Sequence, residues 1–193
     1  MIDGLLDQSE EAVLRRSHAE VRAARLDRHI VFVGFMGAGK SSLAKLTARK
    51  LERKWFDSDR LVTKRSGRSI AEFFGAGDEA EFRALEKQVI AEALELEPMV
   101  LSLGGGALED AETRRLVYEQ AFVIHLAITW RDVQAGLPRF RRTRPLLQGR
   151  SESEIHDLFL RRQMTYRDAH MRIRMPRGDR TAAIDQLLKA LAK

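Results

Sequence analysis

Short apolar runs alternate along the chain with longer stretches whose apolar residues recur at helical spacing. The apolar, often β-branched runs predict buried strands, at residues 30–33, 54–59, 99–103, 122–128 and 171–175. The stretches between them predict helices, at residues 42–51, 69–74, 79–96, 111–118, 154–168 and 181–192. Strands that alternate with helices pair in parallel through right-handed crossovers. The pattern therefore predicts an α/β fold in which helices flank a five-stranded parallel sheet.

The first predicted strand runs into a complete phosphate-binding loop motif, G-x-x-x-x-G-K-[ST], at residues 34–41. A predicted helix follows at once, which is the context that the motif requires. Glycines let backbone N–H groups approach phosphate oxygens, and the helix N-terminus adds unpaired donors and a positive dipole. Lys40 would reach the β- and γ-phosphates, and the Ser41 hydroxyl would bind Mg²⁺. The alternative, a chance glycine turn, would not require both Lys40 and Ser41.

Two carboxylates, Asp57 and Asp59, stand at the end of the second predicted strand. Ligands of open α/β sheets bind at the carboxyl ends of the strands. An acidic side chain there can hold Mg²⁺ through water, or accept the proton of an attacking hydroxyl. The alternative is an Asp that caps the helix that follows.

The helix predicted at residues 79–96 places Glu79, Arg83 and Glu86 on one face, because their spacings are i,i+4 and i,i+3. One interpretation is an arginine that binds an anionic substrate while Glu86 holds it. The other is a surface ladder of ion pairs that contributes little to stability. Phe74 and Phe82 flank this region, where they would form either the apolar wall of a pocket or ordinary core.

Two later segments also suggest a ligand site. Residues 104–106 are three consecutive glycines at the end of a strand, which permit either close approach of the backbone to a ligand or a tight turn. Residues 139–150 are rich in arginine and are interrupted by Pro and Gly, so a loop is predicted. Such a loop can close over a nucleotide and bring a guanidinium to the transferring phosphoryl group; a solvated basic loop is the alternative. His125 lies within an apolar strand and is interpreted as a core histidine with satisfied hydrogen bonds.

Composition narrows the classes of function. The chain has no Cys, which excludes disulfides and thiol catalysis and suits a reducing compartment, so a cytoplasmic location is expected. No apolar run approaches the roughly 18 residues of a membrane helix, and no membrane partner is expected. Residues 131–193 carry a net charge of +8, from 15 Lys or Arg and 7 Asp or Glu. Few aromatic residues lie among these arginines, so a polyanionic small molecule explains them at least as well as nucleic acid, and no nucleic-acid partner is expected.

The first 28 residues are polar, with apolar residues at near-heptad intervals, and predict an N-terminal helical extension. This extension would serve oligomerisation or regulation, or would be a surface segment packed on the domain or frayed from it. One domain is expected over residues 29–193.

A set of motifs, in order along the chain, resembles the shikimate kinase family, small P-loop kinases of the nucleoside-monophosphate-kinase type. The motifs are G-F-M-G-A-G-K-S, F-D-S-D, S-I-A-E-F-F, E-F-R-A-L-E, L-S-L-G-G-G-A, R-P-L-L and R-x-x-x-Y. The resemblance covers about residues 29–192. It implies a three-layer P-loop fold with a lid and a substrate-binding helical segment. It also implies a monomer that uses ATP and Mg²⁺ to phosphorylate the 3-hydroxyl of shikimate, on the route to chorismate and the aromatic amino acids.

For the nucleotide, the resemblance implies a phosphate contact from Lys40 and a second one from Arg144 in the lid. The other positions that would bind ATP are Gly37, Ala38, Gly39, Ser41, Ser42 and Arg177. Ser41 would bind the Mg²⁺ ion, and Asp57 would contact it through water.

For the acceptor, the resemblance implies that Asp59 binds the shikimate hydroxyls and helps to activate the attacking one. With Lys40 and Arg144 it would form the catalytic set. The remaining positions that would contact the substrate are the arginines Arg83 and Arg162, the backbone of Gly105, and the apolar Phe74 and Phe82. Glu86 would orient Arg83.

The chain departs from the family pattern at its N-terminal extension, at Asp78 and near the adenine. Leu137-Pro138-Arg139 stands where the family often has an adenine-stacking arginine, and Arg174 stands where the last strand usually ends in Asp. Two other functions stay open. One is a kinase for another small anionic hydroxy compound, such as gluconate; the other is a non-catalytic nucleotide-dependent or nucleic-acid-binding module.

Overall fold

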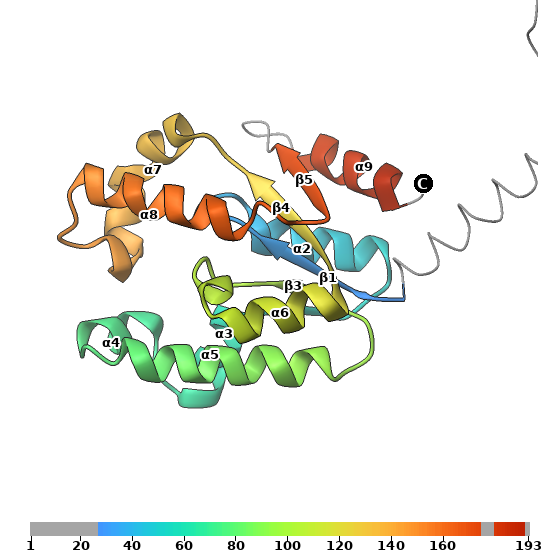
Figure 1. The fold of residues 1–193 in the computed structure, drawn as a ribbon, viewed down its shortest axis with the longest axis horizontal. Helices are drawn as coiled ribbons and strands as arrows, with labels where there is room; N and C mark the ends of the chain where they lie inside the picture. The colour runs from blue at the N-terminus through green and yellow to red at the C-terminus, as the bar shows by residue number, and fades with distance from the viewer. Residues whose placement is uncertain (1–26, 175–179, 192–193) are drawn as a thin grey trace, which may run out of the picture.

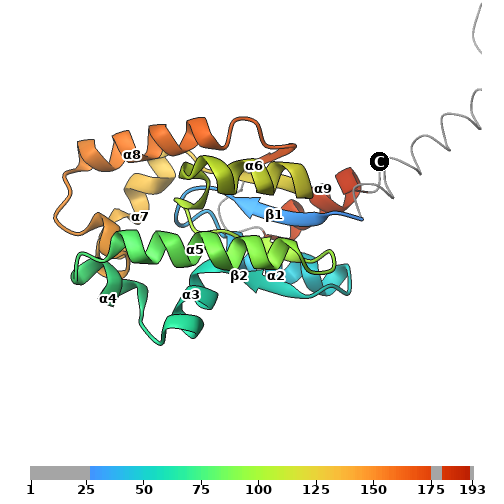
Figure 2. The same ribbon diagram turned by 60° about the horizontal axis from the view of Figure 1, so that its bottom comes forward.

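The computed structural model describes residues 27–174 and 180–191. Across these residues five strands form one sheet, in the order β2-β3-β1-β4-β5, and each neighbouring pair is parallel. The strands are β1 (His29–Val33), β2 (Trp55–Asp57), β3 (Val100–Ser102), β4 (Ala121–Ala127) and β5 (Met171–Arg174). Helices cover both faces of the sheet (Figures 1 and 2). The predicted three-layer α/β fold is confirmed.

Alternation along β1 divides the core between the two faces of the sheet. Ile30 and Phe32 pack with residues of α2 (Lys40–Lys50) and α9 (Arg180–Leu191). Val31 and Val33 pack with residues of α5 (Glu79–Leu94) and α6 (Ala111–Gln120) instead. Every residue of β1 is buried, as expected for a central strand of a parallel sheet that is covered on both faces. The strand that precedes the phosphate-binding loop is therefore fixed from both sides.

The remaining elements gather toward the carboxyl ends of the strands. They are α3 (Ser58–Ser66), α4 (Ile70–Gly75), α7 (Trp130–Thr143), α8 (Glu152–Thr165) and the short 3-10 helices η1 (Ala107–Glu109) and η2 (Pro145–Leu147). A third cluster joins Phe35 of the phosphate-binding loop to Phe140 of α7 and Phe159 of α8. Figure 1 shows α4, α7 and α8 at the same end of the molecule. This end holds the loops that follow β1, β2 and β3.

The arginine-rich segment is helical through Thr143, so the prediction of a loop over residues 139–150 is wrong for its first part. Helix α7 runs through Pro138. Thr129 and Asp132 form a capping box at its start, and Val133, Leu137 and Phe140 are buried along one face. This packed apolar face outweighs the helix-breaking tendency of one proline.

The ends of several elements differ from the prediction by a few residues. Helix α5 stops at Leu94, and α8 begins earlier than expected because Ser151 and Glu154 form a capping box. The helix predicted over residues 1–28 lies outside the described residues except for its last two positions. There the guanidinium of Arg28 donates to the backbone oxygen of Tyr118 at 2.9 Å.

In the part of the chain that the structure describes, no helix is long and apolar enough to cross a membrane.

Candidate active site

A cavity of about 490 Å³ opens at the carboxyl ends of the strands. Its lining includes predicted site residues from well-separated parts of the sequence: Gly37, Gly39, Lys40, Ser41, Ser42, Asp57, Asp59, Phe74, Phe82, Arg83, Gly105, Arg144 and Arg162. Ala38 belongs to the same phosphate-binding loop but is buried in the core. Arg177 lies outside the described residues. The fold thus brings both predicted halves of the site, phosphate-binding and acid-binding, to one cavity.

The phosphate-binding loop supplies backbone and one ammonium group. Gly37 and Gly39 have φ angles of 82° and 89°, in the left-handed region that glycine adopts without steric cost. Lys40 begins α2, and its Nζ donates to the backbone oxygens of Gly34 at 2.7 Å and Phe35 at 3.3 Å. Burial lowers the pKa of Lys40 to about 8, and the nearby charges of Arg162 and Arg144 act in the same direction. A site with this much positive potential favours a polyanionic ligand.

Phe140 on α7 packs directly on this loop. A Cβ atom on Gly37 would lie 2.3 Å from Cζ of Phe140, which is closer than real contacts allow. The ring is 5% exposed and belongs to the cluster that also contains Phe35 and Met36. Helix α7, which carries Arg139 and leads into Arg144, is therefore anchored on the phosphate-binding loop itself.

Ser41 and Asp57 form a cluster of oxygen atoms next to the loop. Oγ of Ser41 donates to Oδ2 of Asp57 at 2.6 Å, and Oγ of Ser102 donates to the same oxygen at 2.7 Å. Oδ1 of Asp57 accepts from the backbone N–H of Arg60, so Asp57 also caps α3. Both interpretations of this aspartate are thus compatible. Hydroxyl and carboxylate oxygens are the ligands that Mg²⁺ prefers, and the residues present fit that ion.

Asp59 lies in the first turn of α3 and lines the cavity. Burial, followed by the charge of Asp57, raises the pKa of its carboxyl above the ordinary value. Across the cavity floor, Oδ1 of Asp59 and Oε1 of Glu86 would lie 2.7 Å and 2.2 Å from a Cβ atom on Gly104. Position 104 is therefore a glycine because two carboxylates occupy the space where a side chain would begin.

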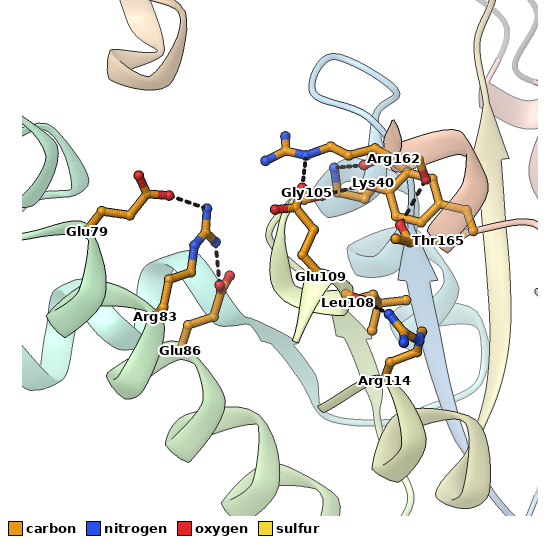
Figure 3. A network of polar contacts seen from close by, with 12 residues as sticks. Lys40, Glu79, Arg83, Glu86, Gly105, Leu108, Glu109, Arg114, Arg162 and Thr165 are labelled. Atoms are coloured by element: carbon orange, nitrogen blue, oxygen red, sulfur yellow. Dashed lines mark hydrogen bonds and ion pairs between the residues drawn. The ribbon is translucent and has the colours of Figure 1, made fainter. Parts of the chain in front are cut away.

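Arg83 projects from α5 between two carboxylates. Its Nη1 donates to Glu86 at 2.7 Å and its Nη2 to Glu79 at 3.2 Å, so the spacing prediction of a shared face is confirmed (Figure 3). Glu86 is only 2% exposed, and burial raises its pKa to about 7. The guanidinium lies 5.2 Å from the ring centroid of Phe82 and 5.9 Å from that of Phe74. Arg83 is thus a partly buried cation with an apolar wall beside it, rather than a member of a surface ladder.

Arg162 reaches the same place from α8. Its side chain is 3% exposed, and its Nε donates to Oε1 of Glu109 at 2.8 Å (Figure 3). A Cβ atom on Gly106 would lie 3.0 Å from Nη2 of Arg162 and 2.8 Å from Nη2 of Arg83. Two guanidiniums from different helices therefore converge over one glycine. Like charges at such close range favour an anion between them, and planar forks suit a carboxylate.

Two further cations line the lid side of the cavity. Arg144 follows the last residue of α7, and Arg139 lies one turn earlier, with its guanidinium 5.1 Å from the ring centroid of Phe140. Within the segment Leu137-Pro138-Arg139, Leu137 is buried in the core cluster of α7 and α8, whereas Arg139 lines the cavity.

His125 is buried in β4 as expected, but its hydrogen bonds are not satisfied. Its Nε2 has no hydrogen-bond partner within the described residues, which corrects the prediction. Burial, with the charges of Arg172 and Lys40, lowers its pKa to about 4 and keeps the ring neutral. The ring packs at 5.0 Å from that of Tyr166.

Three residues of the site were not found from the sequence. Tyr166 donates from its hydroxyl to the backbone oxygen of Gly105, and Ser102 donates to Asp57. Glu109 pairs with Arg162. The R-x-x-x-Y motif was a usable signal for Tyr166, because i,i+4 spacing places it on the helix face of Arg162. Ser102 stands within the L-S-L-G-G-G-A motif, which was a usable signal for it, whereas no periodicity or motif marks Glu109.

Comparison with known proteins agrees with the geometry. The sequence model of the family described as shikimate kinase matches residues 36–192. A shikimate kinase of Geobacillus thermodenitrificans is 34% identical over 168 residues, which are 86% of this chain and 89% of the relative. One of Chromohalobacter salexigens is 37% identical over 162 residues, which are 83% and 89% of the two chains.

Solved structures give the same result. The chain superposes on a shikimate kinase from Acinetobacter baumannii in complex with shikimate, with a TM-score of 0.76, 33% identity and coverage of 88% and 94%. A gluconokinase from Sinorhizobium meliloti gives a TM-score of 0.52 at 15% identity, with coverage of 87% and 93%, and shares the fold alone. The range that the family model matches, residues 36–192, includes Lys40, Arg83, Arg162 and the glycine triplet. The chain belongs to the shikimate kinase family.

Proposed function

We propose that this protein transfers the γ-phosphoryl group of ATP to the 3-hydroxyl of shikimate, giving shikimate 3-phosphate and ADP on the route to chorismate. The observation that carries the proposal is the convergence of Arg83 and Arg162 over Gly106, in the cavity that also contains Lys40. One end of this cavity suits a triphosphate, and the other suits a small carboxylic acid.

The two arginines would bind the carboxylate of shikimate and fix the ring. Glu86 and Glu79 occupy two donors of Arg83, and Glu109 occupies Nε of Arg162, so each guanidinium has a defined orientation before the substrate arrives. Pre-oriented bidentate contacts lower the entropic cost of placing the acceptor hydroxyl. Phe74 and Phe82 would contact the apolar side of the ring, and the backbone of Gly105 would contact a hydroxyl.

Asp59 would accept a hydrogen bond from the attacking hydroxyl and take its proton as the O–P bond forms. A neutral alcohol is a poor nucleophile, so its position in line with the leaving oxygen matters most. Lys40 and Arg144 would stabilise negative charge on the transferring phosphoryl group from opposite sides, one from the loop and one from the lid.

As the resemblance implies, Ser41 would bind Mg²⁺ and Asp57 would contact it through water; the proximity of their side chains, joined by one hydrogen bond of 2.6 Å, supports a shared site. When bound, this ion neutralises phosphate charge and orients the phosphate chain. Adenine contacts from Arg177 stay a prediction from the resemblance alone.

We also propose that the protein acts as a monomer in the cytoplasm, the compartment in which ATP and small metabolites meet. The expectation of a monomer follows from the resemblance to the family. Light scattering during gel filtration would measure the mass; a dimer at micromolar concentration would contradict the first part.

A coupled assay of ADP release tests the function. Purified protein with MgATP is offered shikimate, gluconate or no acceptor. We expect ADP release that depends on shikimate, and shikimate 3-phosphate in the product mixture. Release with gluconate alone would support the kinase for another hydroxy acid. Absence of release with either acceptor, from folded protein, would support a binding module instead.

A further inference from the structure

The two convergent arginines are held in parallel ways, but only one of the holding carboxylates corresponds to a family motif. Arg83 is held by Glu86, three residues further along in E-F-R-A-L-E. Arg162 is held by Glu109, which stands three residues beyond the glycine triplet and 53 positions before its partner. Glu109 has no role in the function proposed so far beyond this contact.

The contact with Glu109 occupies the Nε edge of the Arg162 guanidinium. Nε of Arg162 donates to Glu109 at 2.8 Å (Figure 3), whereas Nη1 and Nη2 lie close to Gly105 and Gly106. Each of these two nitrogens would lie 3.0 Å from a Cβ atom, Nη1 from one on Gly105 and Nη2 from one on Gly106. A guanidinium can bind a carboxylate through either its Nε edge or its Nη edge. With Nε occupied by Glu109, the donors that remain toward the cavity are the Nη pair.

Glu109 is itself placed by a rigid segment. Its backbone N–H donates to the oxygen of Gly106 at 2.9 Å, and that of Ala107 donates to Gly104 at 3.1 Å. Arg114 on α6 donates to the backbone oxygen of Leu108 at 2.9 Å. The carboxylate therefore projects from a short 3-10 helix that is continuous with the glycine triplet, and the ion pair ties this triplet to α8.

The ion pair between Glu109 and Arg162 compensates a buried positive charge. Arg162 is 3% exposed, so its charge has lost most of its hydration, and it faces Arg83 over Gly106. A buried cation that faces another cation requires a compensating charge to hold one position. Glu109 supplies this charge from the side away from the cavity, with its own side chain 46% exposed to water.

We propose that Glu109 is a positioning residue: it binds Nε of Arg162 and thereby aims the Nη pair at the carboxylate of the acceptor. This inference rests on the proposed function, because the ligand that it describes is the carboxylate of shikimate. It predicts that removal of Glu109 weakens recognition of the carboxylate group and leaves the nucleotide end of the cavity unaffected.

The test compares Glu109→Ala and Glu109→Gln with the control Glu119→Ala. Glu119 is also an exposed glutamate paired with an arginine, Arg115, at 2.7 Å, but on the outer surface of α6. Steady-state kinetics are measured with shikimate and with its carboxamide, in which the negative charge is absent. Thermal unfolding of each variant shows that it is folded.

In Glu109→Ala we expect a shikimate KM raised roughly tenfold, with the KM for ATP unchanged. The preference for shikimate over its carboxamide should fall by a similar factor, because the lost contact acts through the carboxylate. Glu109→Gln should recover part of the loss, since its amide oxygen still accepts from Nε. Glu119→Ala should match the wild type.

Three results would overturn the inference while leaving the proposed function intact. They are an unchanged shikimate KM in Glu109→Ala, equal losses for shikimate and carboxamide, and an equal rise in the KM for ATP. Failure of the wild type to phosphorylate shikimate is a separate outcome, which would remove the proposed function and this inference with it.

Discussion

The phosphate end of the cavity consists mainly of backbone, whereas the acid-binding end consists of side chains from distant elements. Residues 34–41 supply the phosphate end as one continuous loop, with a single lysine and the N-terminus of α2. At the other end, Arg83 and Arg162 come from α5 and α8, and their carboxylate partners come from α5 and η1. The two ends meet at the glycines that follow β3.

This difference shows two ways to pre-organise charge. A backbone loop holds its N–H donors in place without any loss of side-chain entropy, but it depends on φ angles that only glycine tolerates well. Two binding side chains can project from backbone of ordinary conformation, but each charged group needs a partner that fixes its orientation. Glu86 does this for Arg83, and Glu109 does it for Arg162. Substitutions at the two ends should therefore fail in different ways.

The largest effect is expected at the phosphate end. Lys40→Met should lower kcat by roughly 10²–10⁴-fold with a smaller change in the shikimate KM, because the lost charge acts on the transition state. Lys45→Met, an exposed lysine on the same helix, is the control and should keep wild-type kinetics. Equal losses in both variants would mean that net charge, rather than position, is responsible.

The backbone requirement can be tested separately with Gly37→Ala. A methyl group there meets a φ of 82° and the ring of Phe140 at 2.3 Å, so we expect a loss of roughly 3 kcal/mol in the free energy of unfolding. Gly67→Ala shares a positive φ of 71° but has no atom within 4 Å of its Cβ position. Denaturant unfolding should show a clearly smaller loss for Gly67→Ala. Similar losses in Gly37→Ala and Gly67→Ala would show that the Phe140 ring moves aside at little cost in free energy.

At the acid-binding end, Arg83→Ala should raise the shikimate KM by roughly 10- to 100-fold and leave the KM for ATP unchanged. Arg65→Ala, which removes an exposed arginine paired with Glu92, serves as the control. An unchanged shikimate KM in Arg83→Ala would remove this arginine from the carboxylate clamp, and the comparison between the two ends would lose its basis.

The smallest effect concerns the pH dependence of stability. Burial raises the pKa of Glu86 to about 7, so the folded state binds more protons than the unfolded state between roughly pH 4.5 and 7. The contribution of Glu86 is therefore complete below pH 4.5 and is lost as the pH rises through 7. Relative to Glu86→Gln, the wild type should lose about 2 kcal/mol of unfolding free energy between pH 5 and pH 8.

Urea titrations at the two pH values measure this difference. Glu79→Gln removes the exposed partner of Arg83 and controls for loss of an ion pair alone. A wild type that gains stability relative to Glu86→Gln as the pH rises would reverse the sign and contradict a raised pKa.

The same contrast explains what could be predicted from the sequence. The phosphate end lies in one contiguous motif, so its residues and its context of strand and helix were predictable from residues 30–51. Arg83 and Glu86 were predictable as a pair because helical spacing places them on one face. The fold class followed from alternation, which both faces of the buried sheet require.

Other contacts depend on distances that no local pattern encodes. The pairing of Glu109 with Arg162 joins residues 53 positions apart through the packing of η1 on α8. Helix α7 was missed because the arginines, Pro and Gly of residues 139–150 suggested a loop, although Val133, Leu137 and Phe140 have helical spacing. The role of Gly104 emerged only with two carboxylates in place above it.

Trp130, the first residue of α7, can serve as an intrinsic fluorescence probe. The chain has two tryptophans. The ring centroid of Trp130 lies 4.5 Å from that of His156 and 5.7 Å from that of Phe159, in tilted contacts, whereas Trp55 belongs to β2 at the edge of the sheet. Replacement of Trp55 by Phe would leave a single indole, on the helix that Arg144 follows. Its emission, measured without any added dye, would then report whether the contact of that helix with α8 changes when nucleotide is added.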